Sequence, residues 1–330
     1  MATPTLQRAR ELDAIKKIRW AKHALNNGLI FTATYHGVSH LPVRLSYGLG
    51  KFGTWLACKS MRRVTSAVMD NFREVFPELS EKKLASLALL TYRSYAYDTI
   101  DFIRSLSRPA DELAHKMIDL DRAVFDRLLA KGKGILLVAA HFGSWELGAV
   151  ILRKLLGYPL TMVVLPEPSE GVNRIRSDMR TSLGIELLEV RQGIDTPLQI
   201  RRQLADNRIV AMLLDRHLGR DHIAVEFCGK DAHFLRTPAL LSYLSGAPML
   251  PAWVVRHPDG RFQCLFDEPV YAERDGDREA TLRRATQAMA DSLAKKVRQY
   301  PHLWYQFYPF WKSQTLEPED ERQHARSNNL

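Results

Sequence analysis

Apolar runs and helical periodicity alternate along the chain from residue 134 onward. Short apolar runs predict buried strands at 134–140, 160–165, 185–190 and 208–215, and helical periodicity follows at 144–157, 171–184, 196–207 and 237–247. Two further strands are predicted at 249–257 and 261–267, joined by a His-Pro-Asp-Gly hairpin turn that makes this edge antiparallel, before a last helix at 277–301. Strands that alternate with helices indicate right-handed crossovers and a mainly parallel sheet covered on both faces.

The first part of the chain has a different pattern. Apolar residues recur at three- and four-residue spacing, so residues 5–130 are predicted to be helical almost throughout, with Ser80 as the N-cap of a long helix. The fold class predicted is α/β, with a mainly parallel sheet flanked by helices and preceded by a helical N-terminal region. We expect a helical region at 1–64, one α/β domain at 65–311 and a polar, disordered tail at 312–330.

Residues 28–58 form an apolar stretch that His36, His40, Pro42, Arg44 and Lys51 interrupt, so no transmembrane helix and no cleavable signal are predicted. Basic residues flank the stretch on both sides. One interpretation is a pair of short helices lying in a membrane interface, and the other is a core helical hairpin with solvated charges. The sequence leaves both open.

Net charge narrows the choice of partners. The 330 residues carry a formal charge of +10, which favours nucleic acid, anionic lipid or an acidic carrier protein. No nucleic-acid-binding signature accompanies this charge, so no nucleic-acid partner is expected. Three cysteines without a CxxC pair, namely Cys58, Cys228 and Cys264, indicate a reducing cytoplasm.

The segment HFGSWE, residues 141–146, carries the candidate chemistry. His141 ends a predicted buried strand and Glu146 lies in the first turn of the next helix, where ligands of parallel sheets bind. His141 could act as general base on a hydroxyl while Glu146 holds the imidazole tautomer. Gly143 could let a substrate approach the backbone, and free N–H groups at the helix start could hold an oxyanion. Alternatively, Glu146 complements the helix dipole and His141 is a buried structural histidine.

Several segments in order resemble one family. HFGSWELG is similar to the His-x4-Asp/Glu motif of glycerolipid acyltransferases, in the form found in late acyltransferases of lipid A biosynthesis and phosphatidylinositol mannoside acyltransferases. The segments 71–102, 132–148, 211–219 and 225–256 also resemble that family, and the resemblance covers about residues 65–311.

This resemblance implies that His141 is the base, that Glu146 assists it, and that no cofactor is needed. The acyl donor would be an acyl carrier protein or coenzyme A thioester, and the acceptor a hydroxyl of a glycolipid or lysolipid. Asp215 and Arg216 would bind the acceptor head group. The implied location is the cytoplasmic face of the bacterial inner membrane, held peripherally or by an interfacial anchor on an anionic surface.

Two departures separate the chain from lipid A members. Leu165-Pro166 stands where those proteins often have Arg-Pro, and the N-terminal membrane helix that many carry is not predicted here. The acceptor therefore stays open. A thioesterase or lipid hydrolase is the alternative enzyme, although no G-x-S-x-G motif occurs, and a non-catalytic protein that binds anionic membranes is the alternative without chemistry.

Further polar and aromatic residues could complete the site. Arg176 and Arg180 lie one helical turn apart and could clasp a phosphate together with Arg174, and Arg236 could add a contact; a solvated face is the alternative for each. Asp215, His217, Asp221 and His222 are metal-ligand types without tight spacing, so no metal is expected. The aromatic run at 300–311 predicts core packing, with an interfacial anchor or an acyl-chain wall as the alternative.

Overall fold

The computed structural model describes residues 28–167, 169–190, 195–216, 221–274 and 276–314. The beginning of the expected interfacial region, up to residue 27, lies outside these ranges. So do His217 and the expected polar tail from residue 315 onward.

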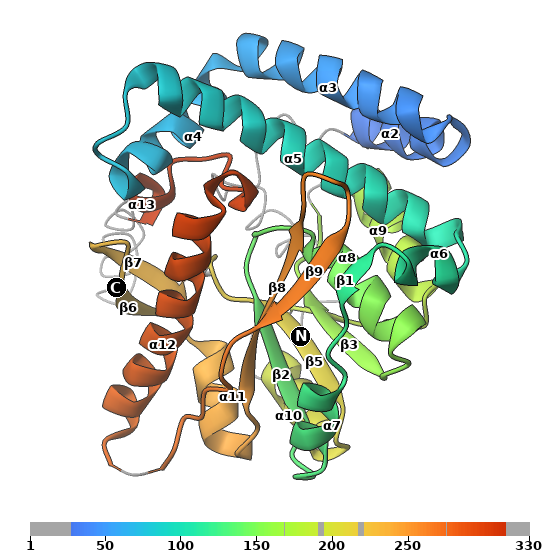
Figure 1. The fold of residues 1–330 in the computed structure, drawn as a ribbon. Helices are drawn as coiled ribbons and strands as arrows, with labels where there is room; N and C mark the ends of the chain where they lie inside the picture. Colours follow the sequence, from blue (N-terminus) through green and yellow to red (C-terminus); the bar gives the residue numbers. More distant parts are fainter. Residues whose placement is uncertain (1–27, 168, 191–194, 217–220, 275, 315–330) are drawn as a thin grey trace, which may run out of the picture.

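A seven-stranded sheet in the order β1-β9-β8-β2-β5-β3-β4 forms the centre of the molecule (Figure 1). All neighbouring strands are parallel except β8 and β9, which the expected hairpin joins. The strands span Met117–Asp119 (β1), Ile135–Ala139 (β2), Leu160–Val164 (β3), Glu186–Glu189 (β4), Ile209–Leu213 (β5), Met249–Arg256 (β8) and Phe262–Phe266 (β9). The predicted fold class is confirmed. Strand β1 was missed, because three residues are too short a run for periodicity to reveal, and it covers β9 at the edge.

Helices cover both faces of the sheet, as the alternating pattern predicts. On one face α7 (Ala123–Leu129), α8 (Trp145–Val150) and the π-helical turn η3 (Ile151–Leu155) pack on residues such as Leu137. On the other face α10 (Asp195–Ala205), α11 (Thr237–Ser245) and α12 (Arg278–Gln299) pack on residues such as Leu136. Because β2 is covered twice, its first four residues are all buried. Helix α9 (Glu170–Thr181) follows β3 and packs against α8.

A two-stranded hairpin of β6 (His222–Phe227) and β7 (Lys230–Leu235) stands apart from the main sheet and packs on α12. This hairpin was not predicted from the sequence. The signal was present: buried and less buried residues alternate along β6, and the turn holds Cys228 and Gly229 at φ of 56° and 84°.

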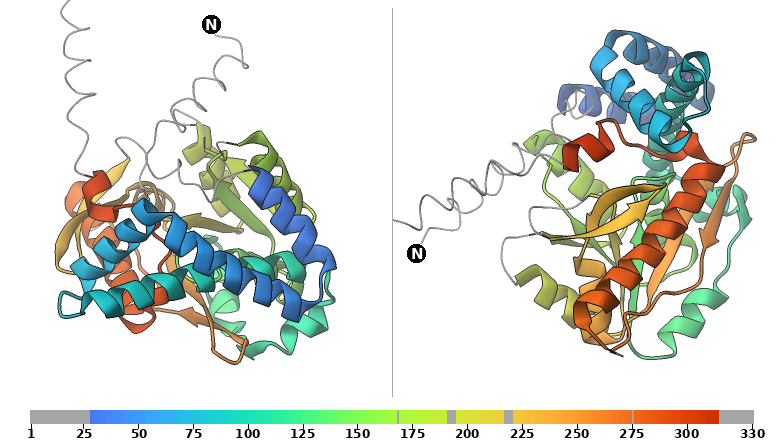
Figure 2. Two further views of the ribbon diagram at one scale, coloured as in Figure 1. Left: turned by 90° about the horizontal axis from the view of Figure 1, so that it is seen from above. Right: turned by 90° about the vertical axis from the view of Figure 1, so that its left-hand side faces the viewer.

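The helical N-terminal region lies across the end of the sheet at which β2 ends (Figures 1 and 2). It consists of α2 (Gly28–His40), α3 (Val43–Ser60), α4 (Arg62–Val75), α5 (Glu81–Ser107) and α6 (Ala110–Ala114). None of the helices in the described part of the chain is both long enough and apolar enough to cross a membrane. After α12, the chain forms η4 (Pro301–Leu303) and α13 (Phe310–Gln314).

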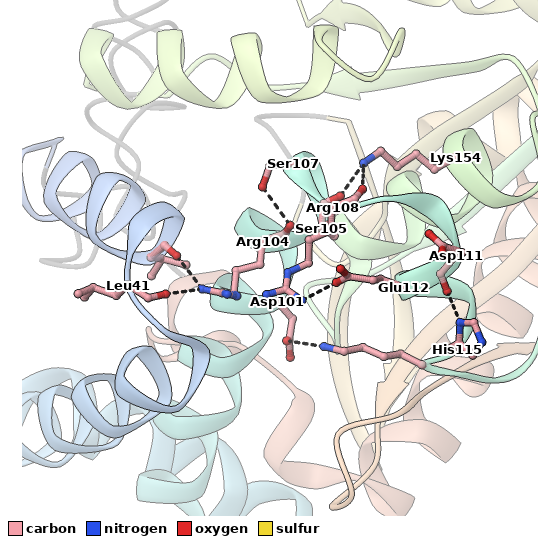
Figure 3. A network of polar contacts seen from close by, with 12 residues as sticks. Leu41, Asp101, Arg104, Ser105, Ser107, Arg108, Asp111, Glu112, His115 and Lys154 are labelled. Atoms are coloured by element: carbon pink, nitrogen blue, oxygen red, sulfur yellow. Dashed lines mark hydrogen bonds and ion pairs between the residues drawn. The ribbon is translucent and has the colours of Figure 1, made fainter.

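Polar contacts fix α5 at its carboxyl end (Figure 3). The Arg104 guanidinium donates to the carbonyls of Val38 and Leu41, at 3.0 and 2.8 Å, and so joins α5 to α2. The Lys154 ammonium donates to three carbonyls at the end of α5, those of Ser105, Leu106 and Arg108, each at 2.8 Å. Lys154 belongs to η3, so the N-terminal helices are tied to the same segment that follows the candidate catalytic loop.

A second anchor lies about one turn before Arg104 on α5. The buried carboxylate of Asp101 accepts from Arg256 of β8 at 2.9 Å and from the Tyr47 hydroxyl of α3. The Arg256 guanidinium also lies over the rings of Tyr47 and Tyr97. One buried ion pair therefore links α3, α5 and the central sheet.

Candidate active site

The candidate base, His141, lies beside Asp215 just beyond the carboxyl ends of two inner strands of the sheet. Strands β2 and β5 are neighbours in register, with Ala139 opposite Leu213, so the residues two positions beyond each strand end also meet. The His141 Nδ1 lies 2.9 Å from Asp215 Oδ1, and the His141 backbone N–H donates to Asp215 Oδ2 at 3.0 Å. Asp215 is fully buried, whereas 19% of the His141 side chain is exposed.

This contact sets the protonation of both groups. Burial opposes ionisation of Asp215, but His141 and Arg216 outweigh it and hold the pKa of Asp215 below its usual range. Burial and the positive charge of Arg216 lower the pKa of His141, against the opposing effect of Asp215. Since an ionised carboxylate can only accept, the neutral imidazole must carry its proton on Nδ1 and leave the lone pair of Nε2 for a substrate.

Asp215 is itself held in place by Gln306, whose amide Nε2 donates to Asp215 Oδ2. Arg216 donates to the carbonyl of Tyr305 and to Gln306 Oε1, each at 3.3 Å, and lies over the ring of Tyr308. Gln306 was missed in the sequence, although a polar residue inside an aromatic run was a usable signal. Asp215 was expected to bind the acceptor head group; the structure buries it behind His141 instead.

Glu146 does not occupy the position expected for it. Its carboxylate forms a two-point ion pair with Arg180, with Nε to Oε2 at 3.2 Å, and Asp215 takes the contact with His141 Nδ1. Burial alone would raise the pKa of Glu146, but the charge of Arg180 outweighs it and lowers that pKa. Arg176, one turn before Arg180 on α9, pairs with Glu167 at 2.7 Å.

The predicted arginines divide into those that line the main cavity and those that do not. Arg176, Arg180 and Arg216 all line the main cavity. Arg236 pairs with Glu279 and does not line it, and Arg174 is largely solvent-exposed beside Asp178.

Gly143 shapes the loop between β2 and α8. It has φ of +60°, and a Cβ at this position would lie 2.1 Å from the carbonyl oxygen of Val254 in β8. The N–H groups of Gly143 and Ser144 donate to the carbonyls of Leu303 and Val254, at 2.8 and 2.9 Å. These two amides are therefore already bonded within the protein, to carbonyls of η4 and β8.

The main cavity has a volume of about 610 Å³ and reaches from His141 deep into the protein. It follows β3 from Leu160 to Val164, a rise of roughly 13 Å along a strand. Charged side chains lie at one end, beside His141. The apolar wall includes Leu120, Phe125, Leu137, Leu152, Leu156, Leu160, Met162 and Phe266. The shape suits a long apolar group whose reactive end lies at His141.

The aromatic run at 300–311 is divided between the core and the main cavity. Trp304 and Phe310 are packed in the core, while Tyr305 and Phe307 line the cavity. The Tyr305 backbone N–H donates to the His141 carbonyl at 2.8 Å. In the described part of the chain, no group of three or more His, Cys, Asp or Glu residues could hold a metal ion.

Comparisons with known proteins show the family of the chain. The family model "Bacterial lipid A biosynthesis acyltransferase" matches residues 16–313. A phosphatidylinositol mannoside acyltransferase of Mycolicibacterium smegmatis is 27% identical over 288 residues, covering 85% of this chain and 90% of the relative. The corresponding protein of Mycobacterium tuberculosis is 29% identical over 217 residues, 65% of this chain and 64% of its own. A lipid A biosynthesis lauroyltransferase of Escherichia coli is 24% identical over 267 residues, 80% of this chain and 84% of its own.

Proposed function

Because the chain belongs to the bacterial lipid A biosynthesis acyltransferase family, we propose that it transfers a fatty acyl group from a thioester to a hydroxyl of a glycolipid or lysolipid. The observation that carries the proposal is the His141 and Asp215 pair at the charged end of the long apolar cavity. The pair supplies a base, and the cavity supplies room for an acyl chain.

The proposed reaction needs no covalent enzyme intermediate. Nε2 of His141 removes the proton of the acceptor hydroxyl as its oxygen attacks the thioester carbonyl, which gives a tetrahedral oxyanion. The C–S bond then breaks, the carbonyl re-forms, and the imidazolium returns the proton to the departing thiolate. Asp215 stabilises the imidazolium while it exists, because its carboxylate lies 2.9 Å from Nδ1.

Glu146 assists in this proposal by holding Arg180 at the cavity. Its ionised carboxylate also favours a positive charge on the nearby imidazole. Arg176, Arg180 and Arg216 line the same cavity, together with Glu146, Glu167 and Asp221. Guanidinium N–H groups at this end would suit the developing oxyanion and the phosphate groups of a lipid head group or a thioester donor.

Acyl carrier protein and coenzyme A are both candidate donors, since each presents its acyl chain on a phosphate-bearing arm. An acidic carrier protein would also be attracted to a protein of charge +10. The donor chain would lie along β3, with its far end near Phe125 and Leu156.

We propose that α3 holds the enzyme on an anionic membrane, at the cytoplasmic face of the bacterial inner membrane. Five large apolar side chains of α3 are 42% to 62% exposed: Leu45, Leu49, Phe52, Trp55 and Leu56. All of them except Trp55 follow a spacing of three and four residues along one face of the helix. Basic residues lie on and next to this helix, and residues 28–60 contain no acidic residue. The combination is typical of a helix that lies in an anionic membrane interface.

The direct test compares wild-type protein with His141→Ala. Each is incubated with acyl-carrier-protein or coenzyme A thioesters and bacterial lipid extract, and acylated lipids are followed by mass spectrometry. Loss of the base should slow transfer by about 10² to 10⁴-fold. His115→Ala, which changes an exposed histidine on the connection after α6, should transfer at the wild-type rate.

Two results would contradict the proposal. Full transfer by folded His141→Ala would remove His141 from the mechanism. Release of free fatty acid without any acylated lipid, across all donors and extracts, would instead identify a thioesterase in which water takes the place of the acceptor.

A further inference from the structure

A small polar cavity lies behind the loop that carries His141. Its volume is about 40 Å³, and its walls include Asp98 of α5, Ser144 and Glu146 of the loop and first turn of α8, Arg176 of α9 and Tyr305. A cavity needs roughly 10–15 Å³ to hold one water molecule, so this one has room for about two or three. Residues that line both cavities separate this small cavity from the main cavity.

The oxygens at this cavity are incompletely bonded. Within the part of the chain that the structure describes, Asp98 Oδ1 and Ser144 Oγ are buried and have no hydrogen-bond partner within 3.5 Å, although the Ser144 hydroxyl lies close enough to Asp98 to lower its pKa. Buried oxygens without partners cost free energy unless water satisfies them. The small cavity beside them has room for water that would complete the bonding of both oxygens.

The other oxygen of Asp98 is connected to His141. Asp98 Oδ2 accepts from the Tyr305 hydroxyl at 2.6 Å, and the Tyr305 backbone N–H donates to the His141 carbonyl at 2.8 Å. The Tyr305 ring packs against Trp145, which in turn contacts the His141 ring edge-on. Tyr305 thus connects Asp98 to His141, through its hydroxyl on one side and its backbone N–H on the other.

We propose that Asp98 is a positioning residue: with Tyr305, Ser144 and water in the small cavity, its carboxylate holds the loop of His141, and its protonation weakens that hold. This inference rests on the proposed function, in which His141 is the base. A charged acceptor holds a hydroxyl more strongly than a neutral one, so ionisation of Asp98 would favour the ordered loop.

The surroundings of Asp98 place its ionisation in the physiological range. Burial is the largest cause, and it raises the pKa of Asp98 to about 7, with a further increase from Asp101 on α5. The hydroxyls of Ser144 and Tyr305 and the charge of Arg256 on β8 act in the opposite direction. Glu146 and Arg176, which also line the small cavity, face Asp98 from α8 and α9.

The first test is the pH dependence of kcat/KM in wild type and Asp98→Asn. Ionisation of Asp98 should give the wild type a rise of about tenfold centred near pH 7, in addition to the lower step of His141. Asp98→Asn, which is neutral at every pH, should lack this rise and match the wild type below about pH 6. Parallel profiles would overturn the proposal.

Two hydroxyl deletions give the direction of the shift. Ser144→Ala and Tyr305→Phe each remove a group that lowers the pKa of Asp98, so each should move the rise near pH 7 to higher pH. Tyr92→Phe is the control. It removes the hydroxyl of a buried tyrosine on α5 that lies 3.4 Å from the Thr65 hydroxyl, and it should leave the pH profile unchanged. Shifts of equal size in all three variants would indicate a general loss of packing and contradict the proposal.

A second measurement does not require activity. In ¹⁵N-labelled wild-type protein, the ring signals of His141, assigned with His141→Ala, should move near pH 7 as Asp98 ionises. The movement should be absent in Asp98→Asn. A wild type that transfers no acyl group but shows this coupling would refute the proposed function and keep the positioning role, whereas His141 signals insensitive to Asp98 would refute the positioning role alone.

Discussion

At the scale of single residues, Asp215 offers the most specific test of the site. It is the largest influence that raises the pKa of His141, while burial and Arg216 lower it. Asp215→Asn should therefore move the acid limb of kcat/KM to lower pH, because the imidazole stays neutral to a more acidic pH. The plateau rate should nevertheless fall by about 10² to 10⁴-fold, because the imidazolium loses its stabilising carboxylate. A pH series of initial rates measures both effects.

Glu146→Gln is the matched control for Asp215→Asn. It also neutralises one buried carboxylate, but its main partner is Arg180 rather than His141. We expect a smaller shift of the acid limb. A shift larger than that of Asp215→Asn would return Glu146 to the role that the motif first suggested.

The two carboxylates also show what sequence could predict at this scale. Position after a buried strand and resemblance to a family brought out His141, Glu146 and Asp215. The pairing was missed because 74 positions separate His141 from Asp215, and two strands intervene in the chain between β2 and β5. Only the order of strands in the sheet makes β2 and β5 neighbours, and that order is not contained in the local pattern.

At the scale of elements, the turn from β2 into α8 depends on Gly143. Gly143→Ala should destabilise the protein by about 2–5 kcal/mol, since it adds a side chain at φ of +60° and a clash with the Val254 carbonyl. Gly157→Ala is the matched control: Gly157 has φ of +74°, but a Cβ there meets nothing within 4 Å, so only the backbone cost of about 1–2 kcal/mol applies. Urea unfolding measures the free energy of both. Equal losses would show that the contact with β8 does not restrain the loop.

The elements themselves were predictable where periodicity was long and regular. The helix at 277–301 and the apolar strands on either side of His141 were identified with small errors at their ends. The hairpin of β6 and β7 was missed because its alternation was treated as part of a loop that closes the site, although Ile223, Val225 and Phe227 are buried on one face. The segment before β2 was treated as continuous helix, since β1 is stabilised by pairing with β9, which is distant in sequence.

At the scale of the whole molecule, α5 connects the exposed helix α3 to the main cavity. Tyr47 of α3 bonds Asp101 of α5, and α5 also supplies Tyr95 to the cavity wall. A membrane bound by α3 would thus hold the cavity at a fixed orientation to the lipid surface. This arrangement explains how a chain without a membrane-spanning helix in its described part could receive a lipid acceptor.

Vesicle flotation tests this arrangement. Burying a large apolar side chain contributes about 1.5–3 kcal/mol, so Phe52→Ser with Leu56→Ser should weaken binding to vesicles containing phosphatidylglycerol by at least about tenfold. Leu198→Ser removes a similarly exposed apolar residue, 46% exposed, from α10 and should bind like the wild type. Raised salt should weaken the wild type as well, because the basic residues around α3 act through screened attraction to the lipid surface. Equal binding by all three proteins would exclude α3 as the membrane contact. If the double variant loses acyl transfer in vesicles but not in detergent, the contact serves delivery of the acceptor rather than chemistry.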